Sequence, residues 1–188
     1  MTNILVLGGS GYIGQNLIQN WLQKDEQAEF YAVSRSGKGQ LYNERLHYIQ
    51  ADVRDEDKLS TQLPKEIDYI INLVGRPESN SNTDQQSNFS PATVALNLAK
   101  KYHVKGLGFV QGKLGPKRFI QTKATIAADY KDSGLPVGIV NPTLVINGGR
   151  KDMLSKIAPV FKFLGLFSKK LKPVSVDDVV DELIQSLT

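Results

Sequence analysis

The stretch Gly8-Gly9-Ser10-Gly11-Tyr12-Ile13-Gly14 directly follows the apolar run Ile4-Leu5-Val6-Leu7. This order predicts a strand, a glycine-rich turn and then a helix that begins inside the stretch. We expect Gly8 to turn the chain off the strand, Gly11 to let a pyrophosphate approach the backbone, and Gly14 to let the helix pack on the sheet. The positive end of such a helix attracts phosphates. The GxxGxxG spacing therefore predicts a dinucleotide-binding turn, with a glycine turn that holds no ligand as the alternative.

The bulk composition is that of an ordinary globular protein. The chain has 188 residues, 40% of them hydrophobic and 22% charged, which suits one well-buried core and one domain over residues 1–188. It has no cysteine, so disulfides and cysteine metal sites are excluded, and we expect no metal site. The net charge of +4 suits solubility, or attraction for an anionic ligand such as a phosphorylated cofactor. The basic residues form no stripe with aromatics of the kind that binds nucleic acid. No export signal or long apolar span is visible, which predicts a cytoplasmic protein without a transmembrane segment.

Strands and helices are expected to alternate along the chain. The predicted strands are 3–7, 29–34, 46–51, 67–74, 106–110 and 137–141, and the predicted helices are 12–23, 55–62, 91–102, 118–133 and 175–187. Alternation of this kind is typical of an α/β fold with a doubly wound parallel sheet, of the Rossmann type. A ligand is then expected at the carboxyl ends of the strands, where the strand order reverses.

Two segments interrupt this alternation. Residues 76–90 contain one large apolar residue, Phe89, and are predicted to be a mobile surface loop. Residues 148–172 are a very small C-terminal segment on the substrate side, apolar between 153 and 167. This segment either lines a small pocket or packs over the end of the sheet. The lysines at 169, 170 and 172 that follow it suit a solvated turn, or an anionic membrane surface or partner.

Several motifs occur together in an order that resembles a known superfamily. They are the glycine stretch 8–14, Asp52-Val53, Asn72-Leu73-Val74-Gly75, Asn141-Pro142-Thr143 and Val176-Asp177-Asp178-Val179-Val180. The set resembles the short-chain dehydrogenase/reductase superfamily over essentially the whole chain. The extended and atypical branches are the more similar ones: NAD(P)-dependent epimerases and dehydratases, NmrA-like proteins, and the nucleotide-binding accessory subunit of respiratory complex I.

The resemblance implies a set of cofactor-binding residues. Asp52 would hydrogen-bond the adenine amino group, Val53 would flank the ring, and Lys123 would hold the nicotinamide ribose. The full set implied is Gly8, Ser10, Gly11, Tyr12, Ile13, Gly14, Asp52, Val53, Leu73, Val74, Gly75, Lys123 and Pro142. Simpler roles remain open, with Asp52 as a turn residue at the end of a strand and Lys123 as a solvated helix residue.

The end of the second predicted strand favours NADP(H) over NAD(H). A site that prefers NAD usually has a carboxylate there to accept a hydrogen bond from the ribose 2′-hydroxyl. This chain has Ser34-Arg35-Ser36, with Lys38 nearby and no acid. An arginine can pair with a 2′-phosphate and stack on adenine, and serine hydroxyls can donate to the phosphate. A solvated Arg35 is the alternative.

The catalytic pair usual in the superfamily is incomplete. Its members use Tyr-x-x-x-Lys on the helix after the fifth strand, because residues four apart share a helix face and the lysine lowers the tyrosine pKa. Here Phe119 precedes Lys123 by four residues, and Gln111 stands at the position of the upstream serine. The catalytic residues are therefore unknown from the sequence, with Lys123 and Gln111 as candidates and Lys113 or Tyr130 as substitutes without geometric support.

Two hypotheses for the function follow. The first is an NADP(H)-dependent oxidoreductase that acts on a small carbonyl compound without the usual tyrosine. The second is a non-catalytic NADP(H)-binding redox sensor or assembly subunit, which Phe119 favours. A pseudoenzyme that has lost the nucleotide is a weaker third. The resemblance fits a monomer or a homodimer.

Overall fold

The computed structural model describes residues 1–143, 145–146 and 174–188. The strands are β1 (Thr2–Leu7), β2 (Ala28–Ser34), β3 (Leu46–Gln50), β4 (Tyr69–Asn72), β5 (Gly106–Val110), β6 (Val137–Val140), β7 (Val145–Ile146) and β8 (Val174–Ser175). The α-helices are α1 (Tyr12–Lys24), α2 (Glu56–Ser60), α3 (Ser81–Asp84), α4 (Ser90–Lys101), α5 (Lys117–Lys131) and α7 (Val176–Gln185), and a π-helical turn, η1 (Gln85–Phe89), joins α3 to α4.

Six parallel strands form one sheet in the order β3-β2-β1-β4-β5-β6. Strand β1 lies at the centre, where Leu7 pairs with Val33 of β2 on one side and with Asn72 of β4 on the other. The chain winds outward from β1 in one direction and then crosses to β4 and winds in the other. The predicted doubly wound sheet is confirmed, and its strand order reverses between β1 and β4.

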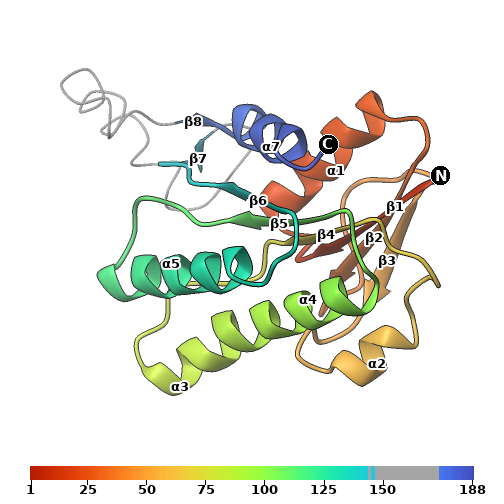
Figure 1. Cartoon of the computed structure of the whole chain (residues 1–188). Coiled ribbons are helices and arrows are strands. Elements are labelled where there is room, and N and C mark those ends of the chain that lie inside the picture. The colour runs from red at the N-terminus through yellow and green to blue at the C-terminus, as the bar shows by residue number, and fades with distance from the viewer. Residues whose placement is uncertain (144, 147–173) are drawn as a thin grey trace.

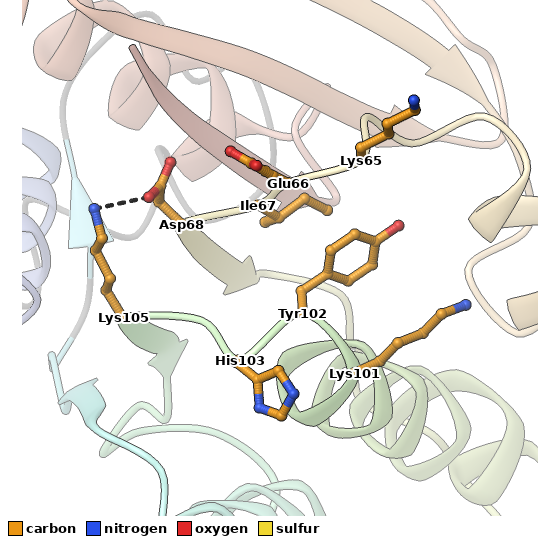
Figure 2. Close-up of a pocket in the computed structure, with 8 residues that line it drawn as sticks. All are labelled: Lys65, Glu66, Ile67, Asp68, Lys101, Tyr102, His103 and Lys105. Carbon is orange, nitrogen blue, oxygen red and sulfur yellow. Dashed lines mark ion pairs between the residues drawn. The ribbon is translucent and has the colours of Figure 1, made fainter.

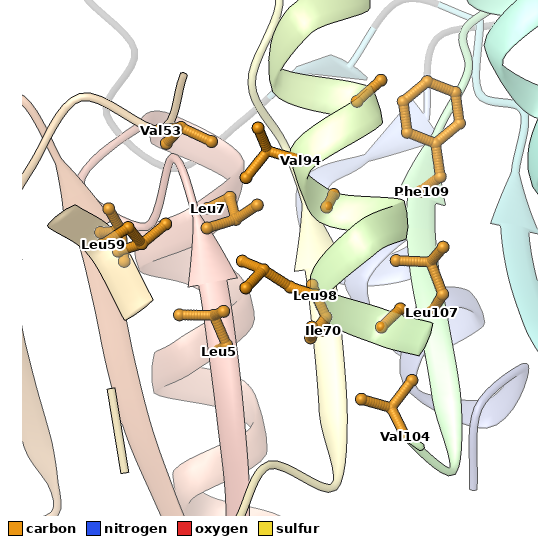
Figure 3. Packing of buried hydrophobic residues seen from close by; sticks show 14 of the residues in the cluster. Leu5, Leu7, Val53, Leu59, Ile70, Val94, Leu98, Val104, Leu107 and Phe109 are labelled. Atoms are coloured by element: carbon orange, nitrogen blue, oxygen red, sulfur yellow. The ribbon is translucent and has the colours of Figure 1, made fainter. Parts of the chain in front are cut away.

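Helices cover both faces of this sheet (Figure 1). Helices α1 and α7 lie on one face, and α2, α4 and α5 lie on the other. Within β1, Ile4 and Val6 pack under α1 and α7, while Leu5 packs on the opposite face with Leu98 of α4 (Figure 3). Every residue from Ile4 to Leu7 is fully buried, which explains why this strand reads as an unbroken apolar run.

Several predicted helix ends are confirmed by their contacts. The Asp55 side chain accepts a hydrogen bond from the Lys58 N–H at 3.1 Å and begins α2. The Ser175 hydroxyl accepts one from the Asp178 N–H at 3.0 Å and begins α7. Gly134 has the left-handed φ of +77, but α5 ends at Lys131 with Asp132 as its C-cap, two residues before the predicted end.

The prediction of a loop over residues 76–90 is wrong. Helix α3 and the π-helical turn η1 occupy most of it and run into α4. The side chains that this segment buries are polar, Asp84 and Asn88, so the hydrophobic pattern contains no sign of a helix. Their burial is possible because both are hydrogen-bonded to other parts of the chain.

One further difference concerns the C-terminal part. The short parallel pair β7 and β8 was not predicted, since two-residue strands leave no periodic signal. The segments 148–172 and 153–167 discussed above lie outside the described residues. Over the positions that the structure describes, no helix combines the length and apolar character needed to cross a membrane.

Candidate functional site

The glycine turn after β1 lies against β2 and the end of β4. Gly8 has φ +84, and its N–H donates to the Val33 carbonyl at 2.9 Å. A Cβ at Gly8 would lie 3.2 Å from the Leu73 carbonyl carbon, and one at Gly9 would lie 2.7 Å from the Cβ of Ala32. The turn therefore packs closely against the strands at the point where the strand order reverses. Gly9, like Gly8, has no room for a side chain.

The other two glycines of the motif shape the start of α1. A Cβ at Gly14 would lie 2.8 Å from the Gly8 carbonyl oxygen and from the Cα of Gly9, so Gly14 lets the helix pack on the turn itself rather than on the sheet. Gly11 is exposed, and no side chain caps the helix there. Since the N–H groups of a first helical turn lack intrahelical partners, this terminus suits an anion. Tyr12 and Ile13 are partly buried beside it.

Three serine hydroxyls connect the glycine turn to the end of β2. The Ser10 Oγ donates to the Ser34 Oγ at 2.8 Å, and the Ser34 and Ser36 Oγ atoms are 3.2 Å apart. The Gly37 N–H also donates to the Ser34 Oγ, at 3.1 Å. Arg35, between two of these serines, is exposed. The result is a cluster of hydroxyl, N–H and guanidinium donors, which we call the serine cluster: Ser10, Ser34, Ser36 and Arg35.

Asp52 follows β3, and its carboxylate is engaged by Arg54. The Arg54 Nε and Nη2 donate to it at 2.9 Å and 2.6 Å, and the Arg54 backbone N–H adds a bond of 3.0 Å. These hydrogen bonds hold the Asp52 pKa at about 2. The neighbouring Val53 is buried in the core. An adenine amino group would have to donate to the same carboxylate oxygens that Arg54 already occupies. The hydrogen bond from adenine to Asp52 stays a prediction.

The end of β4 reaches Lys123 of α5. Leu73, Val74 and Gly75 follow the strand, and Gly75 is exposed with φ +141. A Cβ at Gly75 would lie 3.2 Å from the Lys123 Nζ. Glycine therefore leaves the ammonium group close beneath the surface at the carboxyl edge of the sheet.

Lys123 is 6% exposed and lies in an aromatic environment. Its Nζ is 4.4 Å from the centre of the Phe109 ring and 5.7 Å from that of Phe119. Burial lowers the Lys123 pKa to about 8. The sequence left open whether Lys123 is solvated, and the structure shows that it is buried.

The remaining candidates lie in different environments. Gln111 follows β5, is half-buried, and donates its backbone N–H to the Val140 carbonyl at 2.9 Å. Pro142 is buried after β6, where its carbonyl accepts the Lys113 N–H at 2.7 Å. Tyr130 lies inside the core: its hydroxyl accepts from the Asn72 amide at 2.8 Å and donates to the Ala92 carbonyl, and burial raises its pKa. Tyr130 is therefore a packing residue.

The residues between β4 and α4 are candidates for the site that were not predicted from the sequence. Asn88 bonds both backbone groups of Arg76, and Asp84 bonds Asn88 and Thr122 of α5. The available signal was the four-residue spacing of Asp84 and Asn88, which places both on one side of a helix. A π-helical turn such as η1 is frequent at functional sites.

A pocket lies at the opposite, amino edge of the sheet (Figure 2). It is lined by Lys65, Glu66, Ile67, Asp68, Lys101, Tyr102, His103 and Lys105, and Lys105 pairs with Asp68 at 2.8 Å. None of the predicted site residues lines it. No cluster of three His, Asp or Glu side chains suited to a metal ion occurs in the described part of the chain.

The fold and the edge where these groups meet define a class of protein. A doubly wound sheet with a glycine turn at the reversal point and an uncapped helix start is the architecture of dinucleotide-binding proteins. The family model for NAD-dependent epimerases and dehydratases matches residues 4–132, and the chain belongs to this family, within the short-chain dehydrogenase/reductase superfamily. No curated protein matches this chain in sequence.

Solved structures share the fold at low sequence identity. The Bordetella bronchiseptica enzyme WbmH in complex with NAD+ is 15% identical with a TM-score of 0.75, and the match covers 100% of this chain and 72% of that one. UDP-glucose 4-epimerase from Thermotoga maritima, with UDP-glucose, is 18% identical with a TM-score of 0.77 over 99% and 73% of the two chains. A tyrosine-to-phenylalanine variant of ElxO with NADPH bound is 17% identical with a TM-score of 0.75 over 100% and 91%. These similarities show the fold.

Proposed function

We propose that this protein binds NADP(H) at the carboxyl edge of its sheet and acts as an oxidoreductase on a small carbonyl compound. The serine cluster is the observation that supports the cofactor preference. Ser10 Oγ and Ser34 Oγ are within hydrogen-bond distance of each other, Arg35 is exposed beside them, and no acidic residue follows β2 before Leu46 except Glu44. Residues 1–188 would form one domain around this edge.

The donors of the serine cluster fit a 2′-phosphate better than a 2′-hydroxyl. A phosphate accepts hydrogen bonds on three oxygens and pairs bidentately with a guanidinium group. The serine hydroxyls can rotate from one another toward such an anion, because hydroxyl hydrogens turn freely. A ribose 2′-hydroxyl would lack the carboxylate acceptor that NAD sites usually provide. Asp52, Val53, Leu73 and Val74 would then surround the adenosine half.

Isothermal titration calorimetry with NADPH, NADP+, NADH and NAD+ tests this proposal. We expect Arg35→Ala to weaken NADPH at least about tenfold, the value of one charge-assisted bond, and to change NADH little. Lys65→Ala removes the same charge at the amino edge and is expected to leave both affinities unchanged. Equal losses for NADPH and NADH in Arg35→Ala would contradict the selection of NADP(H).

The bound nicotinamide would supply or accept the hydride, and side chains of the protein would donate or accept the proton. With Phe119 in place of a tyrosine, Lys123 is the proton-bearing group of the candidate pair. Its lowered pKa, about 8, lets the ammonium group both hold and release a proton near neutral pH. Gln111 would orient the carbonyl oxygen through its side-chain amide. NADPH binding by an ElxO variant that replaces a tyrosine with phenylalanine is consistent with cofactor binding without a tyrosine.

Phe119 also favours a second function, that of a non-catalytic NADP(H)-binding sensor or assembly subunit. The Phe119 ring lies on the same helix face as Lys123, so Phe119→Tyr places a hydroxyl near the lysine. NADPH oxidation in the presence of a panel of small aldehydes and ketones separates the two functions. Turnover by the wild type that Lys123→Met abolishes supports the oxidoreductase. Tight NADPH binding with turnover only in Phe119→Tyr supports the non-catalytic protein.

A further inference from the structure

A buried polar network lies between η1 and α5. Asp84 and Asn88 are 5% and 1% exposed, and the Asn88 Nδ2 donates to the Asp84 Oδ1 at 2.7 Å. The Thr122 hydroxyl, also buried, donates to the Asp84 Oδ2 at 2.7 Å. Buried polar groups are costly unless they are bonded, so this network fixes η1 firmly against α5.

The network holds the backbone of one exposed residue, Arg76. The Arg76 N–H donates to the Asn88 Oδ1 at 2.9 Å, and the Asn88 Nδ2 donates to the Arg76 carbonyl at 2.9 Å. Gly75 precedes it in a backbone conformation that favours glycine. A single amide therefore fixes both backbone groups of residue 76 at the carboxyl edge of β4.

The Arg76 side chain is oriented as well. Its Nε donates to the Glu78 Oε1 at 2.6 Å, and the Ser87 hydroxyl donates to the same carboxylate at 2.7 Å. The Glu78 side chain is only 12% exposed, whereas that of Arg76 is 64% exposed. Neither Nη atom of Arg76 has a protein partner within the described positions, so the outer edge of the guanidinium group is available. This edge can bind an oxyanion through two parallel hydrogen bonds.

We propose that Arg76 binds an anionic group, a carboxylate or a phosphate, on the carbonyl substrate of this protein. This inference rests on the proposed oxidoreductase function, because it places the substrate at the same edge. Gly75 connects the two groups: the Lys123 Nζ lies beside it and Arg76 follows it in the chain. A substrate whose carbonyl lies near Lys123 would extend its charged group past Gly75 toward Arg76.

Calorimetry on the NADP+-saturated protein tests the assignment. The oxidised cofactor prevents reduction of the probes, which are pyruvate for the carboxylate and dihydroxyacetone phosphate for the phosphate. Methyl pyruvate and dihydroxyacetone are the neutral counterparts. We expect one anionic probe to bind at least about tenfold more tightly than its neutral counterpart, and Arg76→Gln to remove that advantage. The probe that binds identifies the anionic group.

Two variants control for charge and geometry. Lys65→Gln removes one positive charge at the amino edge and is expected to leave probe binding unchanged, whereas Arg76→Lys keeps the charge but loses the planar fork and is expected to bind less tightly. NADP+ affinity should be the same in all variants. Absence of binding by both anionic probes, equal binding of the neutral compounds, or equal losses in Arg76→Gln and Lys65→Gln would overturn the Arg76 assignment alone. Absence of NADP+ binding would overturn the proposed function and this inference together.

Discussion

Lys123→Met is expected to stabilise the protein at neutral pH. Burial lowers the Lys123 pKa from 10.5 to about 8, and each pKa unit corresponds to about 1.4 kcal/mol. The charged ammonium group therefore costs the folded state about 3 kcal/mol at pH 7. Attraction to the Phe109 and Phe119 rings, whose centres lie 4.4 Å and 5.7 Å from the Lys123 Nζ, offsets about 2 kcal/mol of this cost. We expect the free energy of unfolding to rise by about 1 to 3 kcal/mol, since methionine keeps an unbranched apolar chain against the rings.

The gain in stability of Lys123→Met is expected to depend on pH. The folded-state pKa lies below the unfolded one, so the unfolded chain holds more protons between pH 8 and 10.5. The stability of the wild type, relative to Lys123→Met, therefore rises over this range. The advantage of the variant should be complete below pH 8 and should shrink toward pH 10.5.

Urea unfolding of both proteins at pH 7, 8, 9 and 10 measures this difference. Lys131→Met, an exposed change on the same helix, is the control and is expected to alter stability by less than about 0.5 kcal/mol at every pH. A Lys123→Met variant that is less stable than wild type at pH 7, or a gain that stays constant up to pH 10, would refute the reasoning. Such a result would mean that the ammonium group is well solvated or paired in the folded protein.

Three further changes test the packing around the sheet. His103→Gly is expected to stabilise the protein by about 0.5 to 1 kcal/mol in thermal unfolding, because His103 has φ +50 just after α4, where glycine is unstrained. A loss of stability would show that the His103 side chain contributes more than the backbone strain costs. Gly9→Ala should destabilise the protein by about 1 to 3 kcal/mol and lower the melting temperature, since the new Cβ would lie 2.7 Å from that of Ala32. An unchanged melting temperature would show that β2 moves away from the new methyl group at little cost. Tyr130→Phe should cost about 1 to 3 kcal/mol in urea unfolding, because it leaves the buried Asn72 amide without its acceptor; a neutral effect would indicate that Asn72 finds another partner.

Part of the candidate site could be predicted because its signals are local. The glycine turn, the apolar run before it and the serines around Arg35 are short stretches whose chemistry is visible in the sequence. The position of each at a strand end followed from the alternation of strands and helices, since all strands of a parallel sheet end at one edge. The family assignment agrees with those stretches.

Other parts of the site could not be predicted because they depend on contacts between distant residues. The burial of Lys123 needs Phe109 from the neighbouring strand and the exposed Gly75 from another. In the sequence, Lys123 has the same appearance as a lysine on a solvated helix face. Only the positions of the surrounding elements decide its pKa and its place near the surface.

The sequence by itself determined the order of the six strands of the main sheet, the order of the helices α1, α2, α4, α5 and α7, and the starts of α2 and α7. These depend on residues within a few positions of one another, through periodicity and capping. Only the tertiary structure decided that residues 81–89 are helical and that Asn88 fixes Arg76. Asp84 meets Thr122 across 38 positions, and polar residues can be buried only when such distant partners satisfy their hydrogen bonds. A hydrophobicity pattern treats polar residues as exposed, so it cannot predict polar residues that are buried with distant hydrogen-bond partners.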